Sequence, residues 1–134
     1  MNFGSAEAAI IKFFDTGWGD LTKVAWPDSS FDPPSDETWV RFKCQENAGR
    51  QSSMGSPGSN RFRHMGIITI QVFQPEDQNS KDAREKADAA LAIFMGNSTQ
   101  GIYFYEATAR QVGNDDRGWY QINVNVSFRY DQIT

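Results

Sequence analysis

The single histidine of the chain lies in its most chemically suggestive segment. His64 ends the run Arg-Phe-Arg-His at 61–64, and an imidazole can act as a general base near neutral pH. Such a base also needs a nucleophile or a carboxylate within hydrogen-bonding distance, and the sequence identifies neither. A histidine in a surface or an interface explains the same pattern without catalysis.

Metal binding and covalent catalysis have little support. One histidine and one cysteine, Cys44, supply too few nitrogen and sulfur ligands for a zinc site. Acidic residues between 28 and 37 suggest a cation site or a solvated loop, and they lack the spacing of a calcium-binding loop. Phosphate-binding loops and nucleophile motifs are absent from the sequence. We therefore expect no catalytic residue, no metal and no cofactor.

Basic and aromatic residues alternate at 39–43 and at 61–64. This interleaving is compatible with nucleic-acid binding, with a charged protein interface, or with the polar face of two neighbouring strands. The 17 acidic and 13 basic residues give a net charge of -4, which argues against a general nucleic-acid binder. A protein interface is the favoured functional interpretation of these residues.

The chain of 134 residues fits one domain, 1–134, with enough aromatic residues for a packed core. The N-terminal segment lacks the basic start and apolar run of a signal peptide, and no apolar run approaches the length of a membrane span. A single cysteine excludes an intramolecular disulfide. We expect a soluble, cytoplasmic protein.

Periodicity predicts two helices and about five strands. One helix is expected between the cap Ser5 and Gly17, and another between the cap Ser80 and Gly96. Strands are expected at 21–26, 38–44, 62–73, 102–112 and 119–130. The order helix, strand, linker, two strands, helix, two strands indicates an α+β two-layer sandwich, in which both helices cover one face of a mostly antiparallel or mixed sheet.

Two further features indicate partners. Residues 45–60 form a polar, Gly/Ser-rich stretch between two expected strands, which predicts a flexible arm. Trp119 lies on the otherwise polar face of the last strand, where it either packs under the proline-rich linker or anchors an interface.

Several motifs, in order, resemble the tail terminator (tail-completion) proteins of long-tailed phages and prophages. The similarity covers nearly the whole chain and includes Ala-Trp-Pro at 25–27, Phe31, Pro-Pro at 33–34, Trp-Val-Arg-Phe at 39–42, Gly-Ile-Ile-Thr-Ile-Gln-Val-Phe at 66–73 with Pro75, and Gly-Trp-Tyr-Gln at 118–121 with Asn123, Val124, Phe128 and Tyr130.

This resemblance implies a non-enzymatic virion protein of a siphophage or prophage tail. It implies a homo-hexameric ring that is assembled in the host cytoplasm, caps the tail tube, stops its polymerisation and meets the head-tail connector. DNA would pass through the lumen without specific binding, and no membrane would be involved. From their expected exposure, we select as the candidate assembly interface Arg41, Lys43, Arg50, Met54, Arg61, Arg63, His64, Trp119 and Arg129.

Two alternatives remain open at this point. Another neck or head-tail joining subunit would share the size and the lack of catalysis. A small-ligand binding module or minor enzyme would instead place a pocket between sheet and helix near Trp26, Phe31 and Trp39.

Overall fold

The computed structural model describes residues 1–51, 55, 58–76, 79–115 and 117–133, with only the backbone for Ala48, Arg50 and Gln51. Within these residues the chain forms two helices and six strands, which are α1 (Phe3–Trp18), β1 (Lys23–Ala25), β2 (Trp39–Gln51), β3 (Arg61–Pro75), α2 (Lys81–Phe94), β4 (Ser98–Thr99), β5 (Ile102–Asn114) and β6 (Trp119–Ile133). The α+β class is confirmed.

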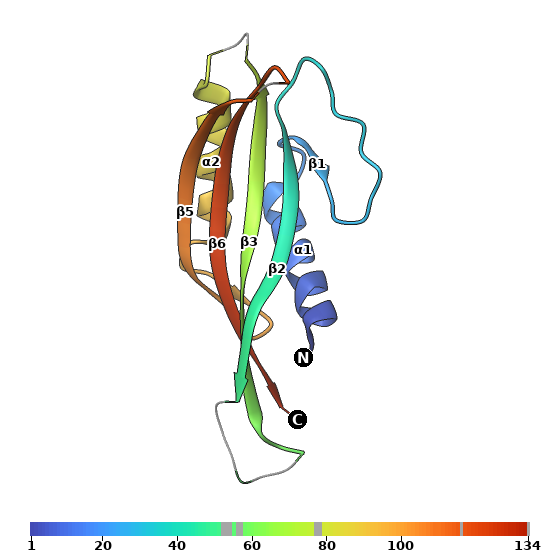
Figure 1. Cartoon of the computed structure of the whole chain (residues 1–134), viewed down its shortest axis with the longest axis vertical. Coiled ribbons are helices and arrows are strands. Elements are labelled where there is room, and N and C mark those ends of the chain that lie inside the picture. Colours follow the sequence, from blue (N-terminus) through green and yellow to red (C-terminus); the bar gives the residue numbers. More distant parts are fainter. Residues whose placement is uncertain (52–54, 56–57, 77–78, 116, 134) are drawn as a thin grey trace.

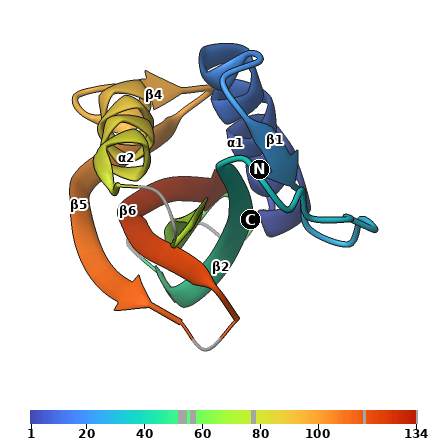
Figure 2. The same cartoon turned by 90° about the horizontal axis from the view of Figure 1, so that it is seen from above.

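The strands form one sheet in the order β1-β2-β3-β6-β5-β4. β1 runs parallel to β2, and all other neighbours are antiparallel. The long strands follow the long axis of the molecule (Figure 1), and the sheet curls strongly beneath the two helices (Figure 2). The prediction of five strands was wrong, because the two-residue strand β4 adds a sixth, and the curl leaves the two-layer description unconfirmed.

Helix α1 begins earlier than predicted, because Asn2 rather than Ser5 is its cap. The Asn2 side-chain oxygen accepts a hydrogen bond from the Ser5 amide at 2.9 Å, and the Ser5 hydroxyl accepts one from the Asn2 amide at 3.0 Å. The two residues thus satisfy each other's free donors. Ser5 therefore contributes to the cap from inside the helix.

The start of helix α2 is held by strand β3. Ser80 is at the cap position, as predicted, but its side chain makes no capping hydrogen bond. Instead, the buried Gln74 accepts a hydrogen bond from the Ala83 amide at 2.7 Å and donates one to the Asn79 carbonyl. A buried amide whose oxygen and nitrogen both bond to backbone fixes where α2 begins on the sheet.

Both helices bury their apolar stripes against the same face of the sheet. Small residues on α2, including Ala83 and Ala87, allow a close approach, and Phe14 of α1 stacks on Phe94 of α2 with ring centroids 5.9 Å apart. The sheet contributes buried residues at alternate positions of β3 and β6. Because successive residues of a strand lie on opposite faces of the sheet, one face packs in the core and the other points outward.

The strands β2 and β3 extend further than the sequence predicted. Strand β2 was expected to end at Cys44 but continues to Gln51, where it pairs with Phe62. The first seven residues of the expected arm therefore belong to the sheet, and the connection from β2 to β3 covers only 52–60. Residues 52–54 and 56–57 lie outside the described residues, so the flexibility of this shorter loop stays a prediction.

Gly66 marks the tightest point of the core. A Cβ atom there would lie 2.3 Å from the Gln45 carbonyl oxygen and 2.5 Å from Cζ of Phe128. No side chain fits at these distances, so β2 and the Phe128 ring can approach β3 only because residue 66 is glycine.

We expect Gly66→Ala to lower the free energy of unfolding by about 2–3 kcal/mol, because a backbone oxygen and a buried ring must both move. Denaturant unfolding measures this change. Gly4→Ala is the matched control, because the added methyl has space in the first turn of α1 and alanine favours a helix. Equal stability of the two variants would show that the packing at Gly66 is not tight.

Candidate assembly surface

The outer sheet face, which is turned away from the helices, collects most of the basic residues that the sequence singled out. Arg41 and Lys43 lie on β2 opposite Gln71 and Thr69 of β3, which in turn face Asn123 and Asn125 of β6. Directly paired residues share a face of the sheet. By the same register, six of the described basic side chains lie on the outer face, which we call the basic face: Arg41, Lys43, Arg61, Arg63, Arg110 and Arg129.

Neutral polar side chains fill the middle of this outer face. Thr69 donates a hydrogen bond to Asn125 at 3.0 Å, and Gln121 donates one to Asn123 at 2.7 Å. The side-chain oxygen of Gln71 is buried and accepts no hydrogen bond from the described residues. The middle of this face is therefore polar and incompletely hydrogen-bonded.

Few acidic groups balance the basic face. Asp131 lies 3.1 Å from Arg63 and 3.7 Å from Arg61, and its hydrogen bond raises the pKa of Arg63. Arg129 lies over the ring of Tyr103, with 5.4 Å between the guanidinium carbon and the ring centroid. Among the described residues, Arg41, Lys43, Arg110 and Arg129 form no ion pair with a carboxylate. Glu106, which pairs with Ser127, is a further carboxylate on this face, so the six described cations outnumber the carboxylates there.

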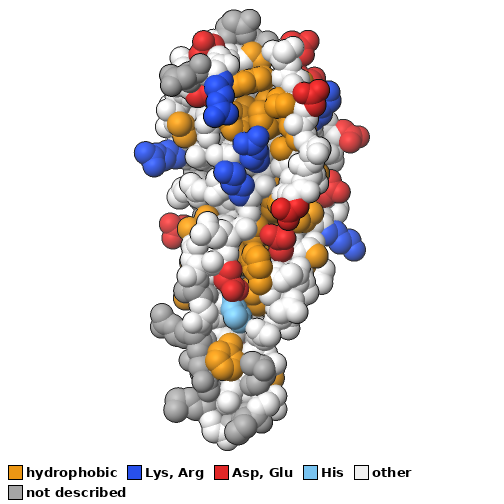
Figure 3. Space-filling model, turned by 45° about the vertical axis from the view of Figure 1, so that its right-hand side comes forward, with side chains coloured by type: hydrophobic (Ala, Val, Ile, Leu, Met, Phe, Trp, Pro, Cys, Tyr) orange, Lys and Arg blue, Asp and Glu red, His pale blue; other side chains and the backbone are white. Residues whose placement is uncertain are grey.

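An aromatic cluster closes the upper end of the outer face. Trp39 stacks on Phe73 at 4.4 Å, Phe31 from the proline-rich linker covers Trp39 at 5.0 Å, and Trp119 meets Trp39 edge-on at 5.9 Å. In the oblique view of Figure 3, basic side chains lie beside hydrophobic ones in the upper part of the molecule. Trp119 is half-buried in this cluster, so packing beside the linker explains it without a partner.

His64 points away from the basic face and lies on the helix side of the sheet, beyond the helices. Its Nε2 lies 2.9 Å from the Gln132 side-chain oxygen, and its ring stacks on Tyr130 at 4.9 Å. Its Nδ1 lies 3.1 Å from the Glu46 carboxylate, although the geometry is not that of a hydrogen bond. The structure thus separates His64 from the arginines that precede it in the sequence.

Tyr130 connects this histidine cluster to strand β2. Its hydroxyl donates a hydrogen bond to Glu46 at 2.6 Å. Burial, followed by this hydrogen bond and the nearby carboxylate, raises the pKa of Tyr130. Burial also raises the pKa of the neighbouring Cys44 thiol to about 12, with Glu7 and Glu46 adding to the effect. These shifts describe a packed structural cluster, since neither group is made more reactive.

The structure adds two residues to the candidate set, describes two of its members incompletely or not at all, and places most of the others on the outer face. Arg110 and Asp131 belong to the outer face but were missed, because only strand register brings them beside the others. Only the backbone of Arg50 is described, and Met54 lies outside the described residues. Arg41, Lys43, Arg61, Arg63 and Arg129 share the outer face in two sets, because Arg41 and Lys43 pair with Gln71 and Thr69, whereas Arg61, Arg63 and Arg129 lie near the start of β3.

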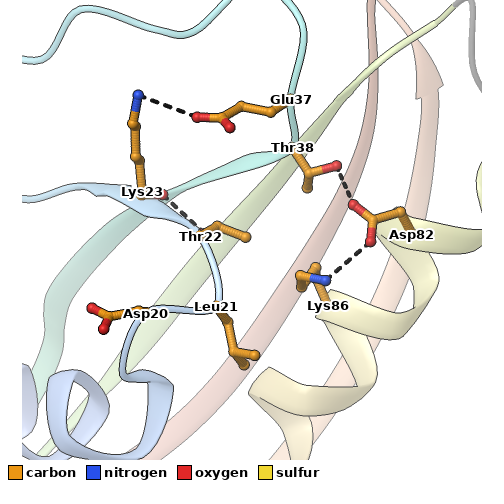
Figure 4. A pocket seen from close by; sticks show the side chains of 8 residues that line it. All are labelled: Asp20, Leu21, Thr22, Lys23, Glu37, Thr38, Asp82 and Lys86. Carbon is orange, nitrogen blue, oxygen red and sulfur yellow. Dashed lines mark hydrogen bonds and ion pairs between the residues drawn. The ribbon is translucent and has the colours of Figure 1, made fainter.

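Two of the hollows on the described surface bear on the alternative of a ligand pocket. In the first, Lys23 points to Glu37 at 3.2 Å, while Thr38 and Lys86 both bind Asp82 (Figure 4). The hydrogen bond from Thr38 lowers the pKa of Asp82. These contacts join α2 to the start of β2.

The second hollow lies between Trp26, Phe31 and β2, where the sequence suggested a ligand pocket, and Arg41 and Lys43 of the basic face also line it. It lacks His64 among its lining residues. Within the described parts of the chain, no three His, Cys, Asp or Glu side chains converge on a metal site. The same parts contain no helix long and apolar enough to cross a membrane.

Comparison with known structures finds this fold in a virion protein. A chain of the solved structure "Virion of native gene transfer agent (GTA) particle" aligns with a TM-score of 0.50 and 18% identity, over 95% of this chain and 93% of that chain. At this low sequence identity, the alignment shows only that the two chains share a fold. No match was found among curated proteins.

The family assignment comes from the sequence itself. The family model described as "Phage tail terminator protein" matches residues 6–128. Because this match spans most of the chain, the chain belongs to the phage tail terminator family. The resemblance of the ordered motifs is thereby confirmed.

We expect Tyr130→Phe to lower the free energy of unfolding by about 1–2 kcal/mol at pH 7, because Glu46 loses its 2.6 Å donor. The unfolded tyrosine loses its proton near pH 10, whereas the folded one retains it. In the wild type, the contribution of the Tyr130 hydroxyl to the free energy of unfolding is therefore fully present below about pH 10 and decreases above it. The Tyr130→Phe variant lacks this contribution at every pH.

Denaturant unfolding between pH 7 and 11 measures both effects. Tyr103→Phe is the control, because Tyr103 is exposed. An identical pH dependence of the wild type and Tyr130→Phe would contradict the described role of the hydroxyl.

Proposed function

We propose that this protein forms a ring that caps the phage tail tube, stops its polymerisation and provides the surface for head attachment. The observation that carries the proposal is the family match, which covers residues 6–128 and therefore nearly all of α1, all of α2 and the strands up to Phe128. The tail tube protein and a head-tail connector protein are the proposed partners. A homo-hexamer in the virion tail, assembled in the host cytoplasm, is the proposed state, with DNA passing unbound through its lumen.

The architecture supports an assembly role. A ring subunit needs two different surfaces that meet repeatedly around a closed circle. The described chain offers an uncovered, basic sheet face on one side and helices with an acidic linker on others. The structurally similar chain comes from a virion particle, which also supports this setting.

The two alternatives differ in support. Another neck or head-tail joining subunit would share the same surfaces, and tail length distinguishes it, because only a terminator controls when tube growth ends. A ligand-binding module receives no support from His64, since the hollow beside Trp26 and Phe31 is open and the histidine lies elsewhere.

The loop from β2 to β3 is the segment whose change should affect capping most. We expect a protein in which residues 52–60 are replaced by Gly-Asn-Gly to remain folded, because with Arg61 this gives a four-residue hairpin loop and leaves the pairing of Gln51 with Phe62 intact. Tube capping should be lost. Tail length, measured by electron microscopy in cells that lack the wild-type protein, should become uncontrolled.

A matched control keeps the nine-residue length and replaces 52–60 by Gly and Ser. If this control also loses length control, the loop sequence contacts the tube; if it does not, loop length is what matters. Normal tail length with the shortened loop would contradict a role for this loop in capping. Absence of the wild-type protein from tail ends would contradict the proposed function itself.

A further inference from the structure

Charge is distributed very unevenly over this chain. Residues 1–38, which comprise α1, β1 and the linker, contain seven acidic and two basic residues. The remaining residues contain 11 basic and 10 acidic residues and are nearly balanced, and six of their described basic side chains lie on the outer sheet face. The N-terminal part of the chain is therefore acidic, and it adjoins a sheet face that carries mostly basic charges.

The acidic side chains of the linker extend into solvent. Asp28, Asp32 and Asp36 are exposed, and none of them forms an ion pair within the described structure. The linker leaves β1, at one edge of the sheet, and loops out beyond it (Figure 1). Arg110 lies on β5, toward the opposite edge of the same sheet.

The linker lines a hollow with Arg41 and Lys43 of its own copy, but it cannot reach Arg110 of that copy, because β2, β3 and β6 lie between them. A neighbouring copy has no such restriction. Complementary patches on two different sides of one chain produce a heterologous, head-to-tail contact, and such contacts close into rings.

We propose that the acidic linker of one copy, through Asp32 and Asp36, docks on the basic face of the next copy, around Lys43 and Arg110. The four unpaired cations of the basic face meet carboxylates that are themselves unpaired, and complementary potentials of this kind steer association and select the partner. This inference rests on the proposed ring.

Paired charge reversals test this contact. Lys43→Glu with Arg110→Glu inverts the basic face, and Asp32→Lys with Asp36→Lys inverts the linker; all four side chains are exposed. Each double variant alone brings like charges together, so its self-association should weaken at least about tenfold. An equimolar mixture should associate again, because each inverted surface then meets its complement on the other variant.

Lys81→Glu with Arg84→Glu is the control for net charge, since both residues are exposed on α2, away from the sheet face. Native mass spectrometry and sedimentation at low and high salt measure association, and wild-type association should weaken as salt screens the contact. Unchanged association of either double variant, failure of the mixture to recover, or a wild type that stays monomeric at low salt would overturn the inference.

A short DNA duplex is the second probe. If inversion of the basic face abolishes binding of the duplex while self-association is unchanged, the face binds phosphate and the proposed contact is wrong. These outcomes leave the tail-length experiment untouched, so the contact can fail while the capping function stands.

Discussion

The alternation of apolar and polar residues along β3 and β6 is the constraint on which the rest of this structure depends. Ile68, Ile70 and Val72 face the helices, so Thr69 and Gln71 must face outward. A slip of one residue would exchange the two faces and bury amides and arginines under the helices. The core therefore fixes the outer face, and the position of every basic residue on it follows from the burial of its neighbours.

This constraint explains which features the sequence predicted well. The long alternation of 119–130 indicated the last strand and its polar face, and the alanine stripe after Ser80 indicated the second helix. The end of β2 was missed because residues 45–51 are polar on both sides; their strand conformation comes from pairing with β3 rather than from burial. Strand β4 was missed because two residues are too few to show an alternation of apolar and polar side chains.

The candidate surface was predictable only in part, for a related reason. The basic candidates on β2, β3 and β6 share the outer face because they occupy alternate positions on strands that were recognised. Arg110 was missed because a bulge in β5 shifts its register, which no periodic pattern reveals. His64 was grouped with Arg63, yet adjacent residues on a strand point to opposite faces, and its partners Glu46 and Gln132 are distant in sequence.

In the proposed ring, a neighbouring copy covers the basic sheet face of each subunit. A cryo-electron microscopy structure of the capped tail end tests it most directly. We predict a closed ring in which the linker carrying Asp32 and Asp36 lies against Lys43 and Arg110 of the next copy. A ring in which this sheet face lines the lumen or is open to solvent would contradict the claim.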